Sequence, residues 1–451
     1  MSTQRHNYCL YWLECLLKER FQPELRLHTQ ADGQLQLTLP TQTAVIKLPP
    51  LSDCFFQAQK NLTCTYWEST TEGWPSLLKR PLPAPGVSKL PSPLISKLDS
   101  HYSIAYDILG LAYWMLTRQE EIGSTNLDQH GRFPATASHA YKHHYLERPI
   151  VDEWLAILGQ VIQRTWPELE LKQPQFSMKV SHDVDKPSLY GFCPPNTLMR
   201  LIGSDLIKKR DFKSLLIAPW IRLNTQQTLH PQDPYNTFDW LMNLSDHYGL
   251  TSAFYFICGG NSSHDADYQP EHPAIRALIR HIHQRGHEIG LHPSYNTYQT
   301  PQAIITEAQR LKKICAEEGI QQAQWGGRMH YLRWEQAITL QAWEQAGMDY
   351  DSTLGYADSP GFRCGTCFEY PAFDPVKQEM LNLRIRPLIV MESSIIAENY
   401  MGLGYSEQAL NTFLNLKEIC RKVGGQFTLL WHNSYFAHRK AKQLYQNMLA
   451  L

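Results

Sequence analysis

Apolar positions recur with two different periods in the first third of the chain. Residues 33–48 alternate between apolar and polar positions, which predicts a β-hairpin, whereas residues 107–121 and 152–166 carry apolar side chains at helical spacing. The Pro-rich stretch at 80–99 excludes regular structure over most of its length. We therefore expect residues 1–172 to form a smaller, mixed α/β domain.

The pattern changes from residue 173 onward, where short apolar strands alternate with amphipathic helices at 273–286 and 301–319. Each predicted strand runs into polar residues at its C-terminal end: FSMKVSHDVD, LTSAFYFICGG, HEIGLHPS, AQWGGRMHY, RIRPLIVMESS and GQFTLLWHNS. Repeated βα units indicate a parallel sheet, closed or open. In such folds the chemistry sits at the C-terminal ends of the strands.

The composition and charge of the chain limit which partners and which cellular compartment can be expected. The chain has 42 Lys and Arg against 43 Asp and Glu, so its net charge gives no field that would attract a nucleic acid. The opening MSTQRHNYCLYWLECLLKERF favours an amphipathic helix over a signal peptide, and no apolar run reaches the ~18 residues of a membrane span. The ten cysteines are scattered, which fits a reducing compartment. We expect a cytoplasmic protein.

Two carboxylates follow the first strand of the second region, in SHDVDKP. If the strand persists to Asp185, its period of two places Asp183 and Asp185 on one face, with His182 and Val184 on the other. Carboxylates this close repel each other unless a cation neutralises them, so the spacing predicts a metal ligand beside a general base. The alternative is a solvated or helix-capping pair of aspartates.

Histidine and arginine residues stand at the ends of later strands. His292 ends the strand of HEIGLH, where imidazole and carboxylate would form a ligand set that zinc accepts, whereas His287 is interpreted as structural. Arg328 and His330 share a face if their strand continues, which would let the arginine hold an aspartate. His432 follows LLW, where it is placed to give a proton to a leaving amine. Ordinary packing histidines and a surface salt bridge are the alternatives.

As a set, SHDVD, GHEIGLHPSYN, GGRMHYLRW and LLWHN resemble the motifs of the polysaccharide deacetylase superfamily (NodB-like, carbohydrate esterase family four), over about residues 175–436. The resemblance implies an α/β fold, with a distorted seven-stranded (β/α) barrel at 173–451. Residues 1–172 look like the accessory domain of a bacterial subgroup associated with cell-surface polysaccharide synthesis. The implied activity is metal-dependent removal of an N-acetyl or similar acyl group from a sugar precursor or nascent polysaccharide.

The resemblance also implies roles for individual residues. It places the general base at Asp183, the general acid at His432, the residue that positions the base at Arg328, and metal ligands at Asp185 and His292. The family's motif has a further histidine where this chain has Asn296. The third protein ligand is therefore open between His330, Asn296 and none, and the expected cofactor is a divalent metal, zinc before others.

Substrate contacts are expected close to these motifs. Tyr295, Tyr331 and Trp431 are candidates to pack on a sugar face, although aromatic residues at strand ends commonly belong to the core. Asp351, in DYDSTLGYADSPGFRCGT, is expected either to orient His432 or to bind substrate.

The insertion at about 187–235 carries basic residues among apolar ones, and its segment 199–222 is a candidate for weak contact with a membrane surface. A lid helix with one solvated basic face is the alternative.

Two further hypotheses compete with the deacetylase. One keeps the fold and the metal but cleaves another C–N amide bond. The other is a metal-free carbohydrate-binding or scaffold protein, which predicts that no metal is retained on purification and that Asp183→Asn has no effect.

Overall fold

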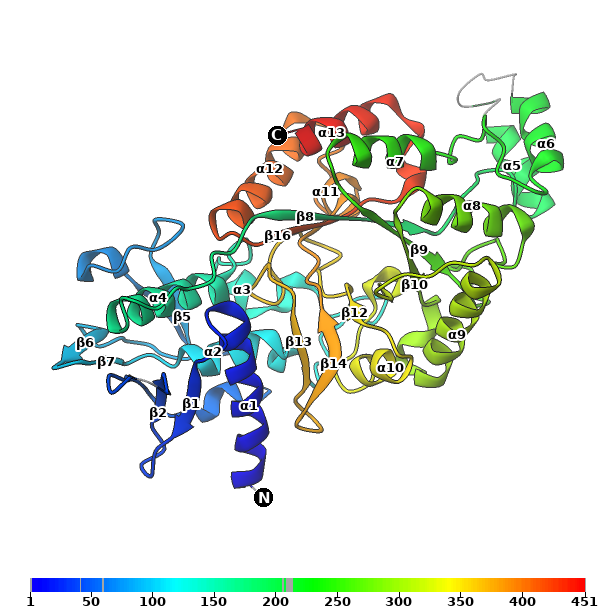
Figure 1. The fold of residues 1–451 in the computed structure, drawn as a ribbon. Coiled ribbons are helices and arrows are strands. Elements are labelled where there is room, and N and C mark those ends of the chain that lie inside the picture. Colours follow the sequence, from blue (N-terminus) through cyan, green and yellow to red (C-terminus); the bar gives the residue numbers. More distant parts are fainter. Residues whose placement is uncertain (1, 41, 59–60, 205–206, 208–213, 451) are drawn as a thin grey trace.

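Two main sheets organise the chain in the computed structural model, which describes residues 2–40, 42–58, 61–204, 207 and 214–450 (Figure 1). The N-terminal segment lies on one side of the molecule, and a larger curved sheet with its helices occupies the other (Figure 1). Among the described residues, no helix combines the length and the apolar composition that crossing a membrane requires.

The N-terminal segment holds a five-stranded sheet of order β1-β2-β3-β7-β6 and a separate β4–β5 hairpin. Its strands are β1 (Arg26–Thr29), β2 (Leu35–Thr38), β3 (Ile46–Leu48), β4 (Cys64–Trp67), β5 (Leu82–Pro85), β6 (Ile95–Leu98) and β7 (His101–Ile104). Its helices are α1 (Ser2–Arg20), α2 (Ile108–Leu116), α3 (His139–Lys142) and α4 (Ile150–Thr165). The predicted hairpin is confirmed as the antiparallel pair β2–β3, and α2 and α4 confirm the two helical patterns. The Pro-rich stretch is less irregular than predicted, because it contains β5 and β6.

Helix α1 connects this segment to the larger sheet through one apolar stripe. Its buried residues recur at helical spacing: Cys9, Trp12, Leu13, Leu16 and Leu17. The Trp12 ring lies 5.3 Å from the Phe373 ring, and its indole N–H donates to the Pro371 carbonyl oxygen at 2.8 Å. The apolar core therefore continues from the N-terminal segment into the larger sheet, while the boundary between residues 172 and 173 stays a prediction.

The larger sheet has the order β13-β14-β12-β11-β10-β9-β8-β16-β15. All neighbours pair in parallel except β13 and β14, which form an antiparallel hairpin. The strands are β8 (Ser177–Val184), β9 (Ser252–Ile257), β10 (Glu288–His292), β11 (Gly326–Gly327), β12 (Tyr350–Asp351), β13 (Tyr370–Asp374), β14 (Glu379–Ile385), β15 (Val390–Met391) and β16 (Gln426–Leu430).

This nine-stranded sheet differs from the predicted seven-stranded barrel. The predicted strand RIRPLIVMESS is divided, because β14 ends at Ile385 and β15 begins at Val390 on the opposite edge of the sheet. The β13–β14 hairpin adds strands that the sequence pattern did not separate. Among the described residues no pairing joins β13 to β15, so the sheet is curved but open at its edges.

Helices follow β8, β9, β10, β11, β15 and β16 of this sheet, in line with the alternating pattern, and none of the described helices lies between β12 and β15. They are α5 (Pro195–Ser204), α6 (Ser214–Asn224), α7 (Phe238–His247), α8 (Pro273–Gln284), α9 (Pro301–Glu317), α10 (Thr339–Gln345), α11 (Glu392–Ile396), α12 (Glu407–Lys422) and α13 (Arg439–Ala450). Because the strands run parallel, their carboxyl ends meet at one edge of the sheet, and the polar residues that follow them are brought together there.

Candidate active site

The aspartate pair lies at the carboxyl end of β8, an inner strand of the larger sheet. Asp183 is 2% exposed near the end of the strand, and Asp185 follows directly after it. His182 points to the opposite face, where its Nδ1–H donates to the Trp431 carbonyl oxygen at 2.7 Å. The alternation predicted for SHDVD is therefore confirmed, and both carboxylates face the same space.

His292 is the last residue of β10 and approaches both aspartates. Its Nδ1–H donates to the Arg328 carbonyl oxygen at 2.6 Å, which leaves the Nε2 lone pair facing the carboxylates. Nε2 lies 3.3 Å from Asp185 Oδ1 and 3.7 Å from Asp183 Oδ2. His287, before the other end of β10, accepts the Ser252 backbone N–H at 3.2 Å, which matches its interpretation as a structural residue.

His330 reaches the same point by a route that the sequence did not predict. Strand β11 ends at Gly327, and His330 stands in a 3-10 turn rather than in a continued strand. Its Nε2 lies 3.7 Å from Asp185 Oδ1, and its Nδ1 lies 3.4 Å from Asp265 Oδ1. Burial lowers the pKa of His330, but Asp185 and Asp265 on either side outweigh burial and raise it to about 9.

These residues fit a divalent cation. One ligand atom each from Asp185, His292 and His330 lie within 4.8 Å of one another. Two of these atoms, Asp185 Oδ1 and His292 Nε2, are buried and have no hydrogen-bond partner. Tetrahedral ligands about 2.1 Å from zinc lie roughly 3.4 Å apart, close to the distance between those two atoms. Asn296, the other candidate for third ligand, is exposed in the following 3-10 helix.

The charges around Asp185 favour its ionised form. Burial acts to raise the pKa of Asp185, but the His330 and His292 imidazoles beside it hold the pKa well below its ordinary value. A carboxylate that stays ionised between imidazoles is ready to bind a cation.

Arg328 holds the other aspartate. The fully buried guanidinium of Arg328 donates one hydrogen bond, from Nη1 to Asp183 Oδ1 at 2.8 Å, and does not form a bidentate pair. Its Nε donates to the carbonyl oxygen of Ser352 at 2.9 Å, and its Nη2 donates to the hydroxyl of Ser352 at 3.1 Å. The approach of this segment to β10 requires glycine, because a Cβ on Gly327 would lie 1.9 Å from the Leu291 carbonyl oxygen.

His432 follows β16 on the opposite side of Asp185. Its Nδ1–H donates to Glu392 Oε1 at 2.5 Å, and its Nε2 lies 3.7 Å from Asp185 Oδ2. Burial lowers the pKa of His432, but the Glu392 and Asp185 carboxylates outweigh burial and raise it to about 10. The histidine therefore faces the site in its protonated form, oriented by a fully buried glutamate.

A cavity of about 470 Å³ opens over this cluster. Its lining includes Asp183, Asp185, His330, Tyr331 and His432, together with Arg132, Lys186, Tyr235, His264, Asp265, Tyr400 and Tyr435. Tyr295 lies beside the cavity, with its ring 5.2 Å from that of Tyr331 and its hydroxyl hydrogen-bonded to His130 Nδ1 at 2.9 Å. Two predicted substrate residues lie elsewhere.

Trp431 and Asp351 are fully buried and are not brought to the cavity. Trp431 stacks between Phe413 and Phe436, at ring distances of 5.5 and 5.4 Å, as a core residue. Asp351 accepts the Thr353 backbone N–H at 2.9 Å and has no contact with His432; burial raises its pKa to about 6. The reason for both differences is the same: each side chain turns inward at its strand end.

Three residues of the site carried no predicted role. Glu392 stood at a predicted strand end, which was a usable signal, but nothing in the sequence paired it with His432. Asp265 lies in the loop after β9, and Arg132 comes from the N-terminal segment, so only the fold brings them to the cavity.

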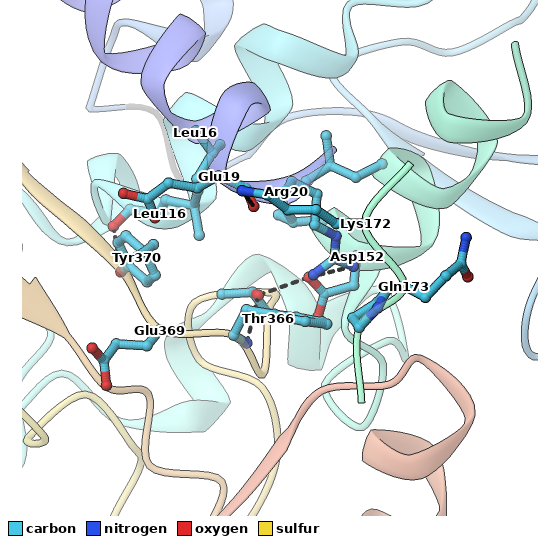
Figure 2. Close-up of a pocket in the computed structure, with 14 residues that line it drawn as sticks. Leu16, Glu19, Arg20, Leu116, Asp152, Lys172, Gln173, Thr366, Glu369 and Tyr370 are labelled. Atoms are coloured by element: carbon cyan, nitrogen blue, oxygen red, sulfur yellow. Dashed lines mark hydrogen bonds and ion pairs between the residues drawn. The ribbon is translucent and has the colours of Figure 1, made fainter. Parts of the chain in front are cut away.

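A second cavity of about 470 Å³ lies between α1, α4 and the loop before β13 (Figure 2). The Asp152 carboxylate accepts hydrogen bonds there from the Thr366 hydroxyl at 2.8 Å and from the Cys367 backbone N–H at 2.9 Å. It also lies 3.6 Å from the guanidinium of Arg20. Its carboxylate is already satisfied by the protein, and the three-residue metal cluster lies in the other cavity. The cavity over Asp183 is therefore the candidate active site.

Comparisons with known proteins found a family model for the N-terminal region and a distant structural likeness. Residues 1–167 match the model of a family of unknown function, DUF7033. No curated protein matches the chain. A solved structure from Mycobacterium smegmatis, provisionally assigned as a polysaccharide deacetylase, has 16% identity and a TM-score of 0.39, and the match covers 62% of this chain and 84% of that one. A structural likeness this weak gives no evidence about function. Any functional proposal must therefore rest on the geometry of the site.

Proposed function

We propose that this protein is a metal-dependent hydrolase that removes an N-acetyl or similar acyl group from a sugar. The observation that carries the proposal is the convergence of Asp185, His292 and His330 on one point between Asp183 and His432. One carboxylate and two imidazoles are the ligand set of catalytic zinc sites, which makes zinc the expected cation.

An amide is a weak electrophile, and its leaving amine must be protonated. Asp185, His292 and His330 would hold a divalent cation, which would supply Lewis acidity to the amide carbonyl and to the attacking water. Asp183 accepts the proton from the attacking water, because the hydrogen bond from Arg328 fixes this carboxylate in position. His432, protonated and oriented by Glu392, donates a proton to the departing amine from the other side.

Metal content is the first test. We expect wild-type protein to hold about one divalent ion per chain after dialysis against zinc, and Asp185→Asn, His292→Ala and His330→Ala to lose it. His287→Ala is the matched control, because His287 is a buried histidine near the other end of β10. A wild-type protein that binds no divalent ion would end the hydrolase proposal and favour the carbohydrate-binding hypothesis.

Acetate release is the second test. The loaded protein is incubated with N-acetylated amino-sugar oligomers, and free acetate and amine are measured. Asp183→Asn is expected to retain metal and lose turnover, since it removes the base and not a ligand. Turnover of a simple amide without a sugar, at a rate equal to that of the oligomers, would favour the broader amidase hypothesis.

A further inference from the structure

The chain between β8 and α7 forms a small helical unit at the edge of the molecule. Helices α5 and α6 pack on each other around a core of their own: Tyr190, Cys193, Leu198, Ala218 and Ile221. Figure 1 shows the pair projecting from the body, on the side away from the N-terminal segment. Part of this unit, residues 205–206 and 208–213, lies outside the described residues.

Large apolar side chains are exposed on this unit to an unusual degree. Six of the sixteen exposed large apolar residues in the described chain belong to it: Met199, Ile207, Leu215, Leu216, Trp220 and Leu223. Leu216, Trp220 and Leu223 recur four and three residues apart on α6, and they are 80%, 57% and 70% exposed. They form one outward stripe, opposite the buried Ala218 and Ile221. A contiguous apolar surface of this kind marks an interaction site.

The exposed stripe argues against a simple lid. A lid helix with a solvated outer face would present polar residues to water and its apolar face to the protein. Here α6 has apolar residues on both faces, with Ala218 and Ile221 packed inward. The outward face is therefore left without an apolar partner among the described residues.

The charge of the unit identifies the partner's chemistry. Residues 195–224 contain six Lys and Arg and two Asp, a net charge of +4 within a chain whose formal net charge is −1. Lys208, Lys209, Arg210 and Lys213 lie outside the described residues and enter only as charge carried by the sequence. Leucine, tryptophan and excess positive charge together are the composition that binds the interface of an anionic lipid bilayer.

Both ends of the insertion are fixed at the rim of the catalytic cavity. Asn433 Nδ2 donates to the carbonyl oxygens of Lys186 and Tyr235, each at 2.9 Å, and both of these residues line the cavity. Asp233 closes the base of the insertion by accepting the Ser188 hydroxyl at 2.5 Å and the Leu189 N–H at 2.8 Å. A surface that binds α6 is thereby held at a set distance from His432, the neighbour of Asn433.

We propose that the exposed face of α5 and α6 docks on an anionic lipid bilayer, and that the acylated sugar presented to the cavity is attached to a membrane lipid. The docking stands on the apolar stripe and the charge alone. The substrate class rests in addition on the proposed hydrolase function.

Vesicle flotation tests the docking. Wild-type protein is expected to float with phosphatidylglycerol-containing vesicles, to bind pure phosphatidylcholine vesicles more weakly, and to be released by high salt. Replacing Leu216, Trp220 and Leu223 with serine is expected to weaken binding at least about tenfold, because each removes apolar area from the interface. The matched control replaces Leu98 and Val376, exposed apolar residues elsewhere in the chain, and is expected to bind like wild type.

Three results would overturn the docking proposal. Wild-type protein could fail to float, or the triple serine variant could float like wild type. Sedimentation could also show that wild type self-associates while the triple variant is monomeric, with neither protein binding vesicles. That result would make the stripe an interface between copies of this chain.

Asp185→Asn separates this proposal from the proposed function. The variant is expected to float like wild type, since Asp185 lines the cavity and is not part of the stripe, and to be unable to hold metal. If wild type floats but neither binds metal nor releases acetate, the docking stands and the hydrolase proposal fails. If wild type releases acetate equally fast from a free oligosaccharide and a lipid-linked one in vesicles, the lipid-linked substrate class is overturned.

Discussion

Arg132 donates a hydrogen bond of 2.9 Å from Nη1 to the carbonyl oxygen of Tyr331, and so joins the N-terminal segment to the wall of the cavity over Asp183. Tyr331 and Leu332 both have left-handed backbones, with φ of 60° and 56°. A non-glycine residue in this conformation costs on the order of 1–3 kcal/mol and persists only when its surroundings hold it. The turn begins at His330, so the contact also bears on a proposed metal ligand.

Arg132→Ala is expected to loosen this turn and weaken metal affinity on the order of tenfold, because supporting contacts orient the ligands of a metal site. Cobalt titration, followed by its visible spectrum, measures both affinity and coordination geometry. Arg148→Ala is the control: it breaks a buried ion pair with Glu153 in the same segment, at 2.7 Å, but does not line the cavity. Equal cobalt spectra and affinities for a folded Arg132→Ala and wild type would refute the role.

Asp265→Asn is expected to reduce metal affinity roughly 10- to 100-fold. The carboxylate lies 3.4 Å from His330 Nδ1 and favours the orientation that turns Nε2 toward Asp185. Isothermal titration with zinc measures the change. Asp267→Asn serves as a control, because Asp267 also lines the cavity but is not among the three clustered metal-ligand candidates. If both variants behave alike, Asp265 contributes only its charge.

Glu392→Gln is expected to lower turnover about 10- to 100-fold, since the glutamate orients and charges the general acid. Glu392 raises the pKa of His432, so its neutralisation lowers that pKa. His432 acts in its protonated form, and the alkaline limb of the pH–rate profile is therefore expected to move to lower pH. Glu398→Gln, exposed just after α11, should leave the profile unchanged. An unmoved alkaline limb in Glu392→Gln would assign that limb to another group.

Acid is expected to destabilise the N-terminal segment through His139. Burial lowers the pKa of this histidine to about 4 from an ordinary value of 6.5. As pH falls below 6.5, His139 becomes protonated in the unfolded chain but stays neutral in the folded chain. The free energy of unfolding therefore decreases until about pH 4. The loss is at most about 3 kcal/mol. Urea unfolding between pH 7 and pH 4 should show a shallower dependence for His139→Gln, and identical slopes would contradict the assignment.

The sequence predicted which residues gather around Asp185 better than it predicted the sheet that holds them. Alternation in a strand is a local property, so the common face of Asp183 and Asp185 followed from their spacing. Strand order is not local, and neither the β13–β14 hairpin nor the division at 386–389 could be read from apolar runs. His330 was expected to share a face with Arg328 if the strand continued, and it reaches Asp185 through a turn with left-handed backbone instead.

What the sequence by itself determined was the identity and order of the chemical groups: an aspartate pair, two histidines, an arginine and a late histidine, each at the end of an apolar strand. The tertiary structure decided which partners hold them. Asp265, Glu392 and Arg132 are 65, 40 and 199 positions from the residues they hold, His330, His432 and Tyr331, and no periodicity relates positions so far apart. The packing of parallel strands, whose carboxyl ends meet on one side of the sheet, brings Asp265 and Glu392 to their partners, and the packing of the N-terminal segment against the sheet brings Arg132 to Tyr331.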